Sequence, residues 1–161
     1  MSYSIYDASI PPVIHMLGNL SSILAKGEAH GGIDPNEARL APDMLPLKNQ
    51  VYIAADVAKG CGARLAGVEA PKYEDVETTF RELKARIAKT IEFLKGLDKN
   101  SFAGAESKDI VLKFPSATYE FNGADYVGKF VLPNVYFHIT TAYGILRNNG
   151  VPLGKGDYLG G

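Results

Sequence analysis

The stretch LPNVYFHITTAYGILRNNGVPLG, residues 132–154, decides the fold that this sequence predicts. Its apolar side chains recur at the spacing of an amphipathic helix, and Gly150 marks the end of that pattern. Asn134 and His138 lie four residues apart, so both side chains point to the same side of the helix. The stretch predicts the last helix of a helical core, with one polar pair on its face.

The N-terminal segment carries a second apolar stripe at helical spacing, from Val13 to Leu24. Pro11 and Pro12 are expected in the first turn of that helix, where a missing N–H costs little. Alternatively they divide a short N-terminal helix from the main one. The glycines at positions 27, 31 and 32 are expected to end it.

A further apolar stripe, from Leu47 to Leu65, predicts a second helix that ends at Gly67. This helix is rich in alanine and glycine. Small side chains allow another helix to approach closely, either within the chain or across a dimer axis.

The clearest helical pattern follows Pro71 and predicts a third helix. Its acidic residues, Glu74, Asp75 and Glu77, are expected at the positive end of the helix. The face that carries the basic residues, Arg86 among them, is expected to be solvated.

Between residues 98 and 122 the periodicity changes to that of short strands. The runs DIVLKF and ATYEF, separated by Pro115 and Ser116, predict a small hairpin. The connection from the third helix to the last is long enough to cross the length of a bundle and permit a parallel pair. We therefore predict an all-α, four-helix bundle, formed as a single domain over residues 1–161. It has one crossover connection and a β-hairpin inserted before the last helix.

The composition is that of an ordinary globular chain, with 46% hydrophobic and 22% charged residues and a formal net charge of −1. This balance argues against a nucleic-acid partner. The longest apolar stretches fall short of the roughly 20 residues of a membrane span, and the first residues lack the features of a signal peptide. The single cysteine, Cys61, is expected to be buried and suits a reducing compartment. A cytoplasmic location without membrane partners is expected.

His138 is the first candidate for a functional residue. The sequence lacks nucleotide-binding, zinc-protease and serine-hydrolase motifs, and its three histidines limit any His-rich metal site. With Asn134 one turn before it, His138 could hold a metal weakly, orient a water or bond to a carboxylate on a facing helix. The alternative is a structural histidine at the edge of the core, satisfied by a neighbouring carbonyl or hydroxyl group.

Gln50 and Asp56 are the polar residues of a second helix that is otherwise suited to close packing. Asp56 would be costly to bury without a partner, so it is expected at the rim or in an ion pair. A carboxylate that met His138 across the core would instead make a weak metal site or an acid–base pair.

Three runs together carry a resemblance to a known superfamily: LAPDMLPLKNQVYIAADVAKGCGARLAGVE (40–69), ETTFRELKARIAKTIEFL (77–94) and FHITTAYGILRNNGVPLGKGDYLG (137–160). They resemble a bacterial family within the DinB/YfiT-like superfamily, and the resemblance covers nearly the whole chain. It implies a four-helix bundle, commonly a homodimer. It also implies a class in which many members hold a divalent ion and some are thiol-dependent transferases or isomerases.

The resemblance also implies where a site would lie. Metal-binding members take one histidine from the second helix and two from an H-x-x-x-H pair on the last helix. Matching the closing L-R-x-x-G to Leu146, Arg147 and Gly150 places the second histidine of that pair at His138 and the first at Asn134. The second helix has no histidine and offers the nearest polar substitutes instead, namely Gln50 and Asp56.

Three hypotheses on function follow. The first is a DinB-like protein with an altered or vestigial pocket for a divalent metal, zinc or nickel, or for a small molecule. Its tentative site residues are His138, Asn134, Asp56 and Gln50. The second is a non-enzymatic homodimer that serves as a binding or stress-associated module. The third is a thiol-dependent transferase.

Overall fold

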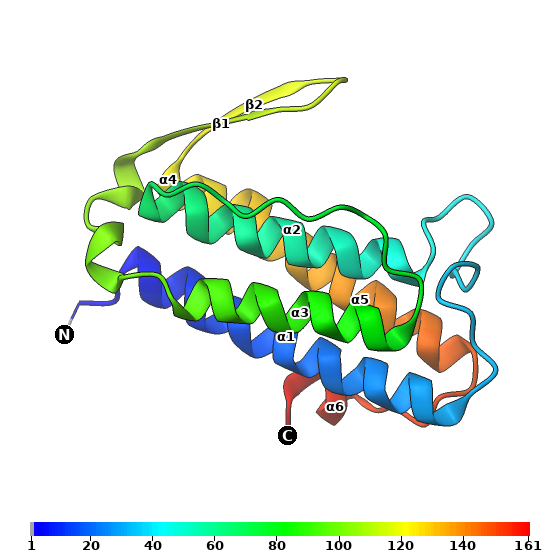
Figure 1. Ribbon diagram of the computed structural model, residues 1–161. Helices are drawn as coiled ribbons and strands as arrows, with labels where there is room; N and C mark the ends of the chain where they lie inside the picture. Colours follow the sequence, from blue (N-terminus) through cyan, green and yellow to red (C-terminus); the bar gives the residue numbers. More distant parts are fainter. Residues whose placement is uncertain (1) are drawn as a thin grey trace.

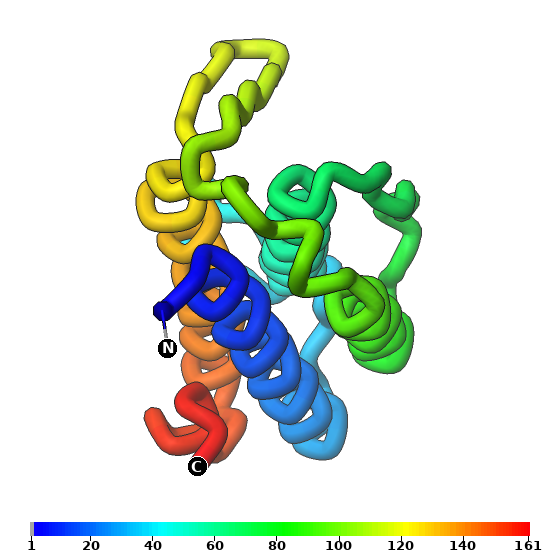
Figure 2. Tube along the Cα trace, turned by 90° about the vertical axis from the view of Figure 1, so that its left-hand side faces the viewer, coloured from blue at the N-terminus to red at the C-terminus, as the bar shows by residue number. Residues whose placement is uncertain are grey.

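Four long helices lie side by side in the computed structural model, which describes residues 2–161 (Figure 1). They are α1 (Ile5–His30), α2 (Leu47–Ala66), α3 (Phe80–Lys95) and α5 (Leu132–Asn148). α1 packs against α3 and α5, and α2 packs against the same two helices, so the four surround one apolar core (Figure 2). The predicted bundle with an inserted hairpin is confirmed.

The crossover lies at a different place from the one expected. α1 and α5 run in one direction along the bundle, and α2 and α3 run in the other (Figure 1). α2 and α3 are therefore consecutive helices that run parallel, and the segment 67–79 between them returns along the length of the bundle. Because α3 begins only at Phe80, the whole segment 67–79 can be extended. An extended chain of this length spans about 40 Å, which exceeds the roughly 24 Å length of α3.

α1 is one unbroken helix, which corrects both expectations for its prolines. Pro11 and Pro12 lie inside it, although each lacks the N–H that would bond to the carbonyl four residues earlier. By length and composition alone α1 could cross a membrane, but half of that apolar window is buried inside the bundle.

The small side chains of α2 face the interior of the chain. A Cβ atom at Gly62 would collide with Leu94 and Leu97, so glycine is what lets these two side chains lie against α2. The helix ends, as expected, at Gly67, whose φ of 72° is the left-handed conformation that glycine adopts freely. Close packing within the chain thus accounts for this composition, and dimerisation stays a prediction.

Residues 109–131 form the hairpin and the turn that leads from it into the last helix. Strands β1 (Asp109–Lys113) and β2 (Thr118–Asn122) pair antiparallel and reach out over the bundle (Figure 1). A short helix, α4 (Gly123–Asp125), and a π-helical turn over Tyr126–Val131 then lead into α5. Such turns disturb the regular helix and often lie near functional sites.

The C-terminal segment ends in a short helix, α6 (Lys155–Leu159), that packs against α1. Asn19 of α1 holds it through a 2.9 Å hydrogen bond to the carbonyl of Tyr158.

Candidate functional site

Gln50 of α2 and His138 of α5 meet at the boundary between their helices. The Oε1 atom of Gln50 lies 2.7 Å from Nδ1 of His138. On its other side, Nε2 of Gln50 donates to the carbonyl of Leu45 at 2.9 Å, which turns Oε1 toward the imidazole. Gln50 is 2% exposed, so this orientation is fixed by burial as well as by both hydrogen bonds.

The contact decides the tautomer of His138. Because Oε1 of Gln50 can only accept, Nδ1 of His138 carries the proton and donates it. Burial lowers the pKa of the His138 imidazole below its ordinary value, so the ring is neutral at pH 7. Its Nε2 therefore keeps a lone pair, which can accept a hydrogen bond or a proton.

Asn134 lies one turn before His138 on α5, and its side chain bonds to the π-helical turn. Its Nδ2 donates to the carbonyl of Phe130 at 2.7 Å. The side chain thus bonds back to the π-helical turn of its own helix. The Oδ1 atom of Asn134 is left as an acceptor.

The donor set at this boundary does not fit a divalent zinc or nickel ion. It consists of one imidazole, His138, and two amide oxygens, which are poor ligands for these metals. The Oε1 atom of Gln50 is also engaged by His138 itself. Among residues 2–161 there is no group of three or more His, Cys, Asp or Glu side chains that could hold a metal.

Asp56 is separate from the Gln50–His138 pair. Its Oδ1 atom lies 3.0 Å from Nη2 of Arg86 and 3.2 Å from Nζ of Lys59. The structure thus brings together Gln50 and His138, with Asn134 beside them, and places Asp56 in an ion cluster on another side of α2. The expectation of an ion pair for Asp56 is confirmed, with Lys59 and Arg86 as the partners.

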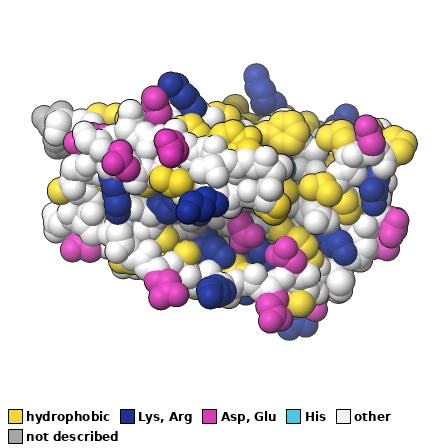
Figure 3. Space-filling model, turned by 90° about the horizontal axis from the view of Figure 1, so that it is seen from above, with side chains coloured by type: hydrophobic (Ala, Val, Ile, Leu, Met, Phe, Trp, Pro, Cys, Tyr) yellow, Lys and Arg dark blue, Asp and Glu magenta, His cyan; other side chains and the backbone are white. Residues whose placement is uncertain are grey.

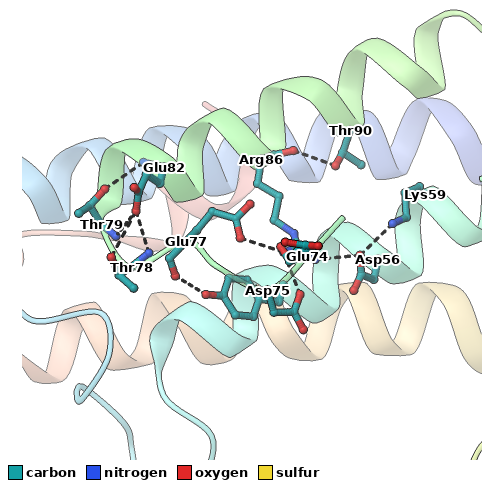
Figure 4. A network of polar contacts seen from close by, with 11 residues as sticks. Asp56, Lys59, Glu74, Asp75, Glu77, Thr78, Thr79, Glu82, Arg86 and Thr90 are labelled. Carbon is teal, nitrogen blue, oxygen red and sulfur yellow. Dashed lines mark hydrogen bonds and ion pairs between the residues drawn. The ribbon is translucent and has the colours of Figure 1, made fainter. Parts of the chain in front are cut away.

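Arg86 is the centre of that cluster, and its burial corrects the expectation of a solvated face (Figure 4). It is 1% exposed and contacts the carboxylates of Asp56, Asp75 and Glu77 at 2.9–3.0 Å. Its guanidinium lies 4.6 Å from the centre of the Tyr52 ring. Burial alone would lower the pKa of Arg86, but the charges of Asp56 and Glu77 outweigh it and raise the pKa.

The acidic residues expected at the start of α3 belong to this cluster instead. α3 begins at a capping box formed by Thr79 and Glu82, after the acidic segment. Asp75 and Glu77 then bind Arg86 from the segment 67–79 and hold it against α2 and α3. The cluster joins the segment 67–79 to α2 and α3, because Arg86 of α3 contacts carboxylates from both α2 and this segment.

A cleft of about 760 Å³ opens beneath the hairpin, between α2 and α5. Apolar and aromatic side chains make most of its wall, and Figure 3 looks down on this side of the molecule, where apolar side chains gather. Asn134 and Asp56 lie at its edge, and His138 lies one turn beyond Asn134. Besides Asn134 and Asp56, its lining includes Ile53, Val57, Arg64, Phe114, Lys129 and Phe130.

An aromatic cluster forms the hairpin side of this cleft. Its rings lie in a continuous chain, with neighbouring centroids 5.9–6.5 Å apart. Aromatic pairs at such separations stabilise one another beyond their buried area. The cluster consists of Phe114, Tyr119, Phe121, Tyr126 and Phe130.

The remaining nucleophile and histidines lie elsewhere. Cys61 is fully buried, and burial raises the pKa of its thiol to about 12, so the thiol stays protonated. His15 contacts the carbonyl of Leu159 at 2.9 Å, and His30 lies exposed at the end of α1. None of the three faces the cleft.

Comparison with known proteins agrees with this fold. A crystal structure of a DinB family member protein from Shewanella denitrificans is similar to the chain, with a TM-score of 0.87 and 42% identity. The match covers 97% of this chain and 92% of that one. None of the curated proteins matches the chain.

The resemblance drawn from the three sequence runs is therefore confirmed. A family model covers residues 5–159, nearly the whole chain. The protein is DinB-like and belongs to the family described as a domain of unknown function, DUF1993.

Proposed function

We propose that the protein binds a small organic molecule, without a metal ion, in the cleft between α2, α5 and the hairpin. The observation that carries this proposal is the cleft itself, whose volume of about 760 Å³ lies in the range of small-molecule sites. Its wall is mainly apolar with a few polar groups at defined places, which is the usual make-up of such sites.

Asn134 lies in the wall of this site, and His138 lies one turn further along α5, outside the wall. The Nδ2 of Asn134 is held by Phe130, and Nδ1 of His138 is held by Gln50, so each side chain is fixed in orientation. The atoms left over, Oδ1 of Asn134 and Nε2 of His138, are both acceptors. A ligand that donates a hydrogen bond from a hydroxyl or amide group suits the wall at Asn134.

The proposal is tested with 2-naphthamide, a neutral aromatic probe, titrated into ¹⁵N-labelled protein and followed by amide chemical shifts. We expect saturable shifts that cluster on α2, α5 and the hairpin around the cleft. A probe that produces no saturable shifts up to its solubility limit, or shifts centred elsewhere, contradicts the proposal.

A matched pair of variants makes the test specific. Phe114→Ser removes a half-exposed ring from the cleft wall, whereas Phe137→Ser removes a similarly exposed ring of α5 outside it. The first change is expected to weaken binding of 2-naphthamide about threefold to tenfold, because apolar contact area is lost. The second is expected to leave binding unchanged. Equal effects of the two changes would place the probe outside the cleft.

A further inference from the structure

We infer that Arg64 anchors the ligand through a negative charge, so that the ligand class is an apolar or aromatic molecule with a single carboxylate. This inference rests on the proposed function and names the chemistry of its ligand. It combines three observations: a guanidinium held in place, the lack of an acidic partner for it, and apolar walls around it.

Arg64 is positioned by two contacts at the C-terminal part of α2. Its Nη1 atom donates to the hydroxyl oxygen of Tyr126 at 3.0 Å, and Tyr126 is fully buried. The same Nη1 lies directly against Gly60, where a Cβ atom would collide with it. The side chain thus folds back along its own helix over a residue that has no side chain, and a buried hydroxyl holds its end.

The charge of Arg64 is not neutralised within the described part of the chain. No carboxylate of residues 2–161 lies within ion-pair distance of it. The other cation of the cleft wall, Lys129, is paired with Asp125 at 2.9 Å. Asp56, the acidic residue of the wall, forms ion pairs with Arg86 and Lys59. Arg64 is therefore the one group of the wall with a charge to offer.

The rest of the cleft selects the body of the ligand. Ile53 and Val57 of α2 face the aromatic cluster across it, which suits a flat apolar group. A guanidinium binds a carboxylate through two parallel hydrogen bonds, and its remaining N–H groups are available for this. Because Arg64 is the one charged group of the wall without an ion-pair partner within residues 2–161, the site suits a single carboxylate.

The test compares 2-naphthoate with 2-naphthamide, which share one ring system and differ in charge. The affinity of the wild-type protein for 2-naphthoate is expected to be at least about tenfold higher, as a charge-assisted hydrogen bond provides. Arg64→Gln is expected to remove this preference, because the affinity for 2-naphthoate falls further than the affinity for 2-naphthamide. Lys129→Gln, a control that removes a paired cation of the same wall, is expected to keep the preference.

Tyr126→Phe distinguishes the effect of the position of the Arg64 side chain from the effect of its charge. It keeps the ring and the charge of Arg64 but removes the hydroxyl that holds Nη1. We expect the preference for 2-naphthoate over 2-naphthamide to fall by about threefold. The amide spectrum of each variant, recorded first, shows whether the bundle is folded.

The outcomes are distinct for the two proposals. If the wild-type protein binds both probes in the cleft with equal affinity, the role of Arg64 is wrong and the proposed function stands. If neither probe binds, both are wrong. If the preference for 2-naphthoate survives in folded Arg64→Gln protein, another cation provides it and the inference is overturned.

Discussion

The Oε1 atom of Gln50 lies 2.7 Å from Nδ1 of His138 and joins the second helix to the last one of the bundle. The resemblance to metal-binding relatives implies that in those proteins a metal ion joins the corresponding two helices. Here an amide and an imidazole complete the same connection by a direct hydrogen bond. The bond also fixes the proton on Nδ1 and leaves Nε2 free, which links the fold to the chemistry available beside the cleft.

The free energy of unfolding is expected to decrease as the pH is lowered, because His138 is buried as a neutral imidazole. In the folded state, burial lowers the pKa of His138 below its ordinary value of 6.5. As the pH falls, the unfolded chain therefore binds the proton before the folded protein does. Its contribution is present above pH 6.5 and is lost progressively as the pH falls through that value toward the folded pKa. Urea unfolding at about pH 7.5 and about pH 5.5 measures the loss, and His138→Gln should show a smaller one. An equal loss in both proteins would contradict the assignment.

Gln50→Glu is expected to raise the pKa of His138. A carboxylate in place of the amide oxygen would accept the same Nδ1–H bond and favour the charged imidazolium. The His138 ring signals in an NMR titration measure the midpoint directly. Gln50→Met, which removes the acceptor without adding charge, is the control and should not raise the midpoint. A pKa that stays unchanged in the glutamate variant would show that the two side chains do not touch in solution.

Arg86→Gln is expected to lower the free energy of unfolding by about 3–5 kcal/mol, the usual cost of breaking a buried ion pair. The reason is Glu77, whose side chain is 10% exposed and would lose its cation. Arg81→Gln, on the exposed side of the same helix, is the matched control and should change the free energy by less than about 0.5 kcal/mol. Urea unfolding measures both. Equal losses in the two variants would mean that Arg86 is solvated, as its basic neighbours are.

Gly123→Ala is expected to destabilise the protein by about 1–3 kcal/mol, as overpacking usually does. A Cβ atom at this position would collide with the carbonyl oxygen of Ala105, a backbone atom that cannot turn away. Gly18→Ala is the opposite case, because no atom lies near its Cβ position inside α1. That change is expected to stabilise the protein by roughly 0.5–1 kcal/mol through helix propensity. Thermal unfolding of the two variants should shift in opposite directions, and shifts of the same sign would contradict this packing.

The helices could be predicted because each carries an apolar stripe of the correct period, and the hairpin because Pro115 and Ser116 divide two β-rich runs. The position of the crossover could not. Pro71 and the acids after it have the features of a helix start, but the capping box of Thr79 and Glu82 lies later in the chain. The acids are used by Arg86 instead, and only tertiary structure reveals that use.

The burial of Arg86 did leave a signal in the sequence. Arg86 lies between Leu83 and Thr90 at helical spacing, on the same side of the helix as both, and next to Ile87. Three acids upstream could supply its partners. The proximity of Gln50 and His138, in contrast, came from the resemblance alone, because spacing along two separate helices does not fix which turns meet.

The most direct test of the account is the metal content of the purified protein after incubation with zinc and desalting. We predict no stoichiometric zinc in the wild-type protein, because the boundary between α2 and α5 offers one imidazole, His138, and two amide oxygens, which are poor ligands for zinc. A variant with Gln50→His and Asn134→His should gain about one zinc ion per chain, held by three imidazoles that include His138. One equivalent of zinc in the wild-type protein, lost in His138→Ala, would contradict the account.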